Sequence, residues 1–380
     1  MSGASPSAGQ REQAGTNRVS PPPGLKWRRL RFVPLGIAAA ALLTGLWVGL
    51  ARLGLALPGG MPVLAEFHGA LMISGFLGTV ISLERAVAIG RWWAYAAPAL
   101  SGLGALALLA GVPPLAAAGF LLAGLALTIN SMVVVVRQPA LFSVALAVAA
   151  ACWAIGTAAW ILGWNTAELT GWWLAFLVLT VAAERLELSR LLSPPRLSQV
   201  TFACAAALIL IGAARRELAG NPALFSGMGL IGATLWLLKH DVALRTVRQL
   251  GQTRFSATCM ISGYVWLGAA GLLLLLAPPG TAAFTYDAAV HAIAIGFIFS
   301  MIFGHAPIIL PAVTGLRVGF SGFAYAPLAL LHVSVLLRVA GDLLAWTDLR
   351  AGTGPLTMVA LAGYAGTLIV ASRARRQPVR

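Results

Sequence analysis

The sequence is short of charged residues. Only 10% of its 380 residues are Asp, Glu, Lys or Arg, whereas a water-soluble domain has about a quarter. Among the charged residues the acidic ones are rarer, with 11 Asp and Glu against 26 Lys and Arg. This composition excludes an ordinary soluble domain. Because the basic residues are spread along the chain rather than gathered in one segment, we expect no nucleic-acid partner.

Cysteine is also rare. The three cysteines stand far apart, with no pair at C-x-x-C spacing, which argues against a zinc site or a thiol redox motif. Each lies in an apolar run and is predicted to pack as a small apolar residue.

Long apolar runs are what the sequence has in abundance. Hydrophobic residues make up 59% of the chain, and its mean hydropathy is +0.87. A helix needs about 20 apolar residues to cross the hydrocarbon core of a bilayer. We therefore predict an all-α polytopic membrane protein with about twelve transmembrane helices. The predicted crossings are 31–56, 64–88, 93–112, 114–136, 141–163, 171–192, 197–214, 221–239, 256–277, 285–308, 321–343 and 354–372.

The charges predict how these helices are oriented. Basic residues fall mainly on alternate loops, and only Arg215 and Arg216 stand out on the opposite side. The positive-inside rule then places both chain ends in the cytoplasm of a bacterial-type inner membrane. Residues 1–28 are predicted to be a disordered basic tail and 373–380 a second basic tail, flanking one membrane domain at 29–372.

Two histidines occupy matching places. His68 lies near the start of the second predicted helix and His291 near the start of the tenth. Both helices run in the same direction, so the two side chains are expected at similar depth. Two imidazoles at equal depth can ligate one haem iron from opposite faces. Alternatively, each histidine hydrogen-bonds a neighbouring helix or relays protons. Asp287, one turn before His291, is expected to accept the imidazole N–H.

Small residues follow His68 on one helical face. Gly75, Thr79 and Ser82 lie within about 40° of it at 100° per residue. Such a stripe suits either a flat macrocycle lying along the helix or a close contact with another helix.

The other two histidines in apolar runs suggest a second site. His305 and His332 are predicted on the tenth and eleventh helices, where they would hold a metal such as copper, or a second haem. The alternative is that His305 caps a broken helix, because Gly304, Pro307 and Pro311 are expected to interrupt the tenth helix there.

Several charged residues lie in or beside the predicted helices. Arg338 and Asp342 are spaced i, i+4 and are predicted to form an ion pair. A second group lies at the ends of the second and sixth helices and forms either a solvated network or, if those helices are neighbours, the entrance of a proton or ion path. This group comprises Glu84, Arg85, Glu184, Arg185 and Glu187.

These features together resemble a known architecture. Twelve helices with both ends inside, and histidines on helices two and ten, are similar to the catalytic subunit of haem-copper oxidases. The Glu-Arg pairs on helices two and six are compatible with the three four-helix arcs of that subunit. The segments His68 to Phe76 and His291 to Phe297 more closely resemble the NnrS family, twelve-helix haem- and copper-containing membrane proteins associated with nitric oxide metabolism. The resemblance implies a haem on His68 and His291, and a diatomic ligand or an electron donor as partner.

The sequence also departs from the oxidase pattern. Residues 171–214 contain no histidine, so the binuclear centre that reduces oxygen is excluded. The predicted function is a haem-binding, NnrS-like membrane protein linked to the nitric oxide response or to electron transfer. Two alternatives are a secondary transporter with a broken tenth helix near His305, and a non-catalytic protein of assembly or stress tolerance.

Overall fold

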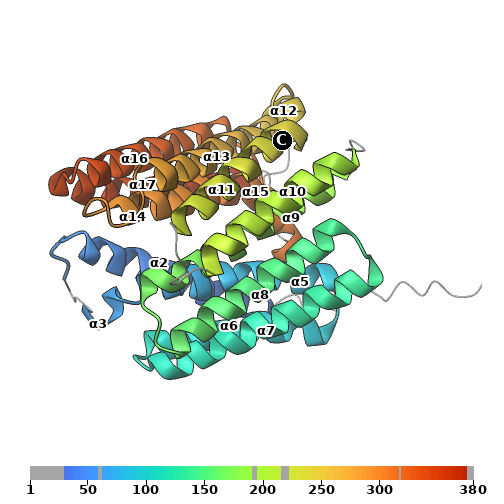
Figure 1. Ribbon diagram of the computed structural model, residues 1–380, viewed down its shortest axis with the longest axis horizontal. Helices are drawn as coiled ribbons and strands as arrows, with labels where there is room; N and C mark the ends of the chain where they lie inside the picture. Colours follow the sequence, from blue (N-terminus) through green and yellow to red (C-terminus); the bar gives the residue numbers. More distant parts are fainter. Residues whose placement is uncertain (1–29, 59–61, 191–194, 215–221, 316–317, 375–380) are drawn as a thin grey trace, which may run out of the picture.

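The chain folds into a bundle of long helices. A computed structural model describes residues 30–58, 62–190, 195–214, 222–315 and 318–374. Within these ranges every regular element is a helix (Figure 1). Eleven helical spans are long and apolar enough to cross a membrane. Arg215 and Arg216, which bear on the predicted orientation, lie outside the described residues.

The first half of the chain contains six long helices, two of them preceded by short turns. Its elements are α2 (Phe32–Arg52), α3 (Pro62–Ala65), α4 (His68–Ala70), η2 (Leu71–Gly78), α5 (Thr79–Ile89), η3 (Trp92–Tyr95), α6 (Ala96–Leu109), α7 (Pro113–Arg137), α8 (Leu141–Ile161) and α9 (Thr166–Ser189).

The second half has a similar build. Its elements are α10 (Arg196–Ala214), α11 (Pro222–His240), α12 (Ala243–Thr246), α13 (Gly251–Leu276), α14 (Thr285–His291), η5 (Ala292–Phe299), α15 (Ser300–Thr314), η6 (Gly322–Ala324), α16 (Tyr325–Leu343) and α17 (Thr347–Ala374).

The predicted crossings correspond to these helices, with one difference. The eighth prediction, 221–239, matches α11, which has 19 residues but is not among the eleven apolar spans. The glycines of α11 serve close packing: a Cβ at Gly229 would lie 2.7 Å from the backbone nitrogen of Ile209 in α10.

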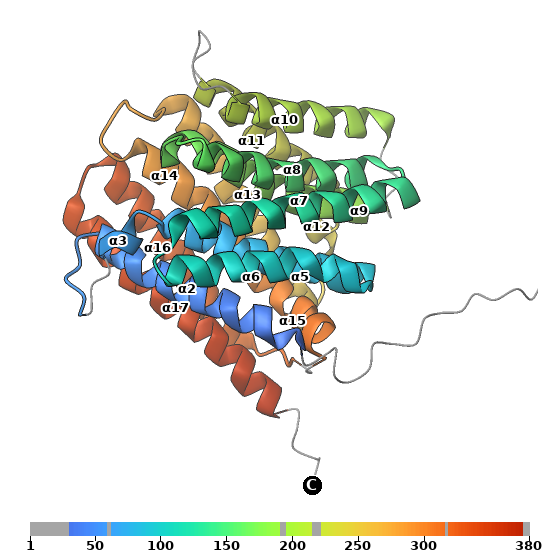
Figure 2. The same ribbon diagram turned by 90° about the horizontal axis from the view of Figure 1, so that it is seen from below.

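Neighbours along the chain are neighbours in space. The long helices pack one against the next from α6 to α11, α13 packs on α11, and α17 returns to contact α2. Figure 2 shows α5 to α10 running side by side. Since successive long helices alternate in direction, the bundle has two ends, which we name the His68 end and the Glu84 end after the residues near the start of α4 and the end of α5.

The predicted break in the tenth helix is absent. Helix α15 continues through Pro307 and Pro311 and ends at Thr314, where Gly315 adopts a left-handed conformation with φ of 75°. Proline has no N–H, so Pro307 leaves the carbonyl of Phe303 without its helical donor. The hydroxyl of Tyr364 in α17 donates to that carbonyl. The bond replaces the missing one, and the helix stays intact.

This replacement can be measured. Tyr364→Phe should lower the stability of the protein by about 1 kcal/mol or more, because it leaves a buried carbonyl unpaired. The change is read from denaturant unfolding in detergent. Tyr325→Phe is the matched control, since the buried hydroxyl of Tyr325 has no hydrogen-bond partner among the described residues. An equal loss in both variants would show that Tyr364 acts only through its ring.

Candidate functional site

The helices that carry His68 and His291 share an unusual construction. In each, eight residues of π-helix interrupt the α-helix: η2 begins three residues after His68, and η5 begins directly after His291. π-Helical turns are rare and occur often at functional sites. The two histidines and the two wide turns therefore form a matched pair.

His68 is held by helix α2. Its Nδ1 lies 2.8 Å from the carbonyl oxygen of Gly45. A carbonyl only accepts, so Nδ1 carries the proton, and in the neutral ring Nε2 keeps a free lone pair. Gly49 lies directly beneath the ring, where a Cβ would come within 2.8 Å of its Cε1 atom. The side chain is half-buried.

His291 is held in the same way within its own helix. Its Nδ1 lies 2.8 Å from the main-chain carbonyl oxygen of Asp287. The expected residue thus supplies the acceptor, but the atom is the carbonyl and not the carboxylate. Nε2 is again the nitrogen with an available lone pair. The charges of His68 and His291 interact, so the two side chains lie in the same region of the bundle.

Below the histidines, equivalent positions of the two helices face each other. Eight residues after each histidine, Phe76 and Phe299 stack with ring centroids 6.3 Å apart and planes inclined by 18°. Four residues after each histidine, Met72 and Ile295 pack with these rings in one apolar cluster. A π-turn holds more residues than an α-turn. Residues four and eight positions after a histidine therefore lie closer to the same helix face than they would in an α-helix. An apolar cluster that includes Phe76, Phe299, Met72 and Ile295 therefore follows the two histidines along their helices.

The small-residue stripe has the second of its two predicted roles. Gly75 faces Ala41 and Ala105 of neighbouring helices, and the hydroxyl of Thr79 lies 2.8 Å from that of Ser101 in α6. The stripe is therefore a helix contact at Gly75 and Thr79.

A buried network of ion pairs lies beside His291. The predicted Arg338–Asp342 pair is present, with Nε 3.0 Å from Oδ2, and the Asp342 side chain is fully buried. Arg350 completes the network: it contacts Asp342 and lies 2.9 Å from Oδ2 of Asp287. Arg338 also reaches Asp287, at 3.4 Å. Two cations and two anions thus balance one another.

Sequence reasoning missed Arg350 because it lies in the turn region before the twelfth predicted crossing. The chain reverses there through Ala345, which has φ of 51°. Gly341 makes room, since a Cβ on it would lie 2.9 Å from Cγ of Arg350. The guanidinium also lies over the ring of Phe284, 3.4 Å from its centroid.

A second charged cluster lies toward the Glu84 end. Arg85 of α5 pairs with Glu184 of α9, so the two helices are neighbours, as the entrance hypothesis required. Arg185 is buried and donates to Nε2 of His305 over 2.8 Å. Glu84 is close enough to Arg85, Glu184 and Arg185 for their charges to interact.

One predicted member lies at the surface of the cluster. Glu187 is exposed on α9, and its charge interacts with that of Arg85. Asp241, just after the end of α11, also belongs to the cluster: its Oδ2 lies 3.9 Å from Nε of Arg185 and accepts the hydroxyl of Tyr264 over 2.6 Å.

The contacts of His305 and His332 do not support a shared metal site. In His305, Nδ1 lies 2.6 Å from the carbonyl of Met301, and Nε2 accepts from the permanently charged Arg185. In His332, Nδ1 accepts from Trp266 and Nε2 donates to Ser262. Both nitrogens of each ring are engaged, and the described residues contain no group of three or more His, Cys, Asp or Glu side chains able to hold a metal ion. We assign no copper to this pair.

A family model described as a domain of unknown function, DUF8744, matches residues 29–373. The chain belongs to the DUF8744 family. The matched range covers every helix described above, including both histidine helices and both charged clusters. No curated protein matches the chain.

The ion-pair network of this DUF8744 chain makes a testable prediction. Asp342→Asn should destabilise the protein by about 3–5 kcal/mol, because it removes one partner of buried charges and leaves Arg338 and Arg350 sharing Asp287. Denaturant unfolding in detergent measures the effect. Asp348→Asn is the control, since Asp348 is exposed in the first turn of α17 and should change stability by about 1 kcal/mol or less. Equal effects at the two positions would contradict the role given to the network.

Proposed function

We propose that the chain is a multi-pass protein of a bacterial-type inner membrane, with twelve crossings that include α11 and with both ends in the cytoplasm. The distribution of basic residues supports this orientation. At the His68 end the described basic residues are Arg52, Arg338 and Arg350, and the last two are paired with aspartates. Those at the Glu84 end are Arg31, Arg85, Arg91, Arg137, Arg185, Arg190, Arg196, Lys239, Arg245, Arg248, Arg254 and Arg373.

The three-arc arrangement belongs to the same proposal. Its units would be α2 to α7, α8 to α11 and α13 to α17, each with four crossings. The histidine helices then occupy the second place in the first unit and the second place in the third.

We further propose that the protein binds one haem between His68 and His291. The observation that carries this proposal is the matched pair of histidine helices, in which each Nδ1–H is engaged by a carbonyl and each Nε2 is available. A histidine that ligates a metal characteristically donates its other N–H to an acceptor, which fixes the ring and its tautomer. Both side chains have this arrangement already.

A haem with two histidine ligands supplies one-electron transfer. The residues of the chain would hold the ligands still and keep water away. Gly45 and Asp287 fix the two rings, and Phe76 with Phe299 closes the space toward the middle of the bundle. Because both histidines would hold the haem, electron transfer fits this ligand set best. The NnrS-like link to nitric oxide is a second role.

The transporter alternative has lost its main support. It rested on a discontinuous tenth helix near His305, whereas α15 is continuous through both prolines. His305 is instead fixed between Met301 and Arg185.

An optical spectrum of the purified protein tests haem binding. The wild-type chain should show the Soret band and the sharp reduced α-band of a six-coordinate low-spin haem. His68→Ala and His291→Ala should each lose at least most of the bound haem, because each removes one of only two ligands. His332→Ala, a control that removes a histidine of similar burial, should keep the spectrum. A colourless wild-type protein that is folded, after expression with ample haem, would sink the proposal.

Cysteine labelling tests the orientation. In a background without the three native cysteines, Arg196→Cys and Arg254→Cys should react with a membrane-impermeant maleimide only from the cytoplasmic side. Thr281→Cys, exposed in the loop before α14 at the opposite end, should react only from outside. The reverse pattern would overturn the topology.

A further inference from the structure

Five exposed basic side chains come together at the Glu84 end of the bundle. They lie at the start of α10, at the end of α11, in the connection that contains α12, and at the start of α13. We call this surface the basic patch, and its residues are Arg196, Lys239, Arg245, Arg248 and Arg254. Beyond the orientation of the chain, they have no part in the function proposed above.

Contacts between these elements make the patch one surface. The indole Nε1 of Trp236, near the end of α11, donates to the carbonyl oxygen of Ser198 over 2.8 Å, which places the start of α10 beside the end of α11. Nε of Arg254 donates to the carbonyl oxygen of Gln249 over 2.7 Å, which ties the start of α13 to the connection. The guanidinium of Arg254 stays exposed.

The patch has no compensating carboxylate. Asp241 is the one acidic residue between Lys239 and Arg254, and its side chain is buried. Its Oδ1 accepts the backbone N–H of Ala243 over 2.7 Å, and its Oδ2 accepts the hydroxyl of Tyr264. In the part of the chain that the structure describes, none of the five patch residues forms an ion pair. Five positive charges are therefore exposed together.

Exposed apolar side chains border the patch. Leu197 and Val200 follow Arg196 along α10 and are 70% and 56% exposed. Leu244 and Leu250 lie between basic residues of the connection and are 43% and 79% exposed. Figure 2 shows α10 along one edge of the bundle. In a membrane, such apolar side chains face acyl chains, whereas Lys and Arg near a helix end extend to the interface. The basic patch therefore lies at the level of the lipid headgroups.

We propose that the basic patch binds the headgroup of an anionic phospholipid. The phosphodiester carries a negative charge and oxygen atoms that accept charge-assisted hydrogen bonds from guanidinium groups. Clusters of about four to eight basic residues beside the end of a transmembrane helix are typical of such binding. Leu244 and Leu250 would contact the acyl chains. The inference rests on the proposed membrane placement, but not on which end of the bundle faces the cytoplasm.

The same end of the bundle offers a matched control. Arg91, just after α5, and Arg137, the last residue of α7, are also exposed, but they belong to helices of the first half and not to the patch. A general attraction between an anionic lipid and a positive surface would involve them equally. Binding to the patch would depend on Arg245 and Arg248 instead.

Native mass spectrometry of the full-length protein in detergent tests the proposal. The probes are dioleoyl phosphatidylglycerol and dioleoyl phosphatidylcholine. One basic residue near an anionic headgroup strengthens binding by up to about fivefold. The wild-type chain should therefore bind phosphatidylglycerol at least about fivefold more tightly than phosphatidylcholine. Arg245→Gln with Arg248→Gln should remove most of this preference and leave phosphatidylcholine binding unchanged, whereas Arg91→Gln with Arg137→Gln should keep it.

Two further variants separate the possible causes of failure. His68→Ala should bind phosphatidylglycerol as the wild-type chain does, because the patch lies at the opposite end of the bundle from the histidine. An error in the orientation would appear in the cysteine labelling and would leave this measurement unchanged. If the Arg245→Gln, Arg248→Gln variant does not fold, Leu250→Glu takes its place, since a carboxylate within the patch should also weaken phosphatidylglycerol binding.

Three results would overturn the proposal. The first is equal affinity of the wild-type chain for the two lipids. The second is an equal loss of phosphatidylglycerol binding in the patch variant and in the Arg91→Gln, Arg137→Gln control. The third is a short RNA that binds the wild-type chain more tightly than phosphatidylglycerol and is lost in the patch variant, which would assign the patch to a different partner.

Discussion

Hydrogen bonds from side chains to backbone carbonyls organise this bundle. In surroundings this apolar, each unsatisfied polar group costs several kcal/mol, so a carbonyl that loses its helical donor requires a side chain in its place. Tyr364 supplies the donor that Pro307 removes. The imidazoles of His68 and His291 donate to carbonyls of Gly45 and Asp287. The same constraint that keeps α15 intact also fixes the tautomers of the paired histidines.

The buried charged side chains are paired in a similar way. The two clusters lie toward opposite ends of the bundle, and in each the guanidinium groups are joined to carboxylates from other helices. The Arg338 and Arg350 network ties α14, α16 and α17 together beside His291, while Arg185 joins α9 to α15 and to the end of α11. Removal of one partner would leave the other charges buried without a counter-charge, which is strongly destabilising. These contacts therefore hold the helices in register around the histidine pair.

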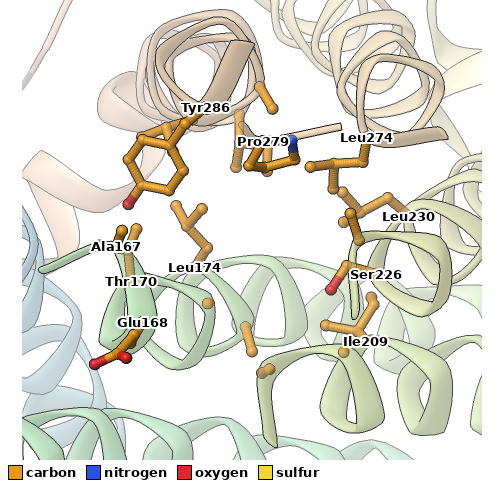
Figure 3. A pocket seen from close by; sticks show the side chains of 18 of the residues that line it. Ala167, Glu168, Thr170, Leu174, Ile209, Ser226, Leu230, Leu274, Pro279 and Tyr286 are labelled. Atoms are coloured by element: carbon orange, nitrogen blue, oxygen red, sulfur yellow. The ribbon is translucent and has the colours of Figure 1, made fainter. Parts of the chain in front are cut away.

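Much of this arrangement was accessible from the sequence, for a physical reason. Length and hydropathy decide whether a segment can span a bilayer, so the helices fell near their predicted ranges, and i, i+4 spacing was enough for Arg338 and Asp342. What the sequence could not predict depends on contacts between distant segments. Nothing near Pro307 indicates that Tyr364 will complete its helix, and nothing near Asp287 shows that Arg350 will occupy its carboxylate. A pocket of about 430 Å³ lined by Leu174, Leu230 and Tyr286 (Figure 3) is formed by five helices and has no local motif.

The paired π-segments set the direction in which the two histidines point. A π-turn accommodates an extra residue within an α-helix, and removing one residue from an α-helix rotates everything beyond it by about 100°. A single-codon deletion between His68 and Phe76 would therefore turn the histidine away from its partner. The π-segment begins three residues after His68 and one residue after His291. In both helices it includes the residue eight positions after the histidine, so the direction of each imidazole relative to Phe76 or Phe299 depends on the wide turn between them.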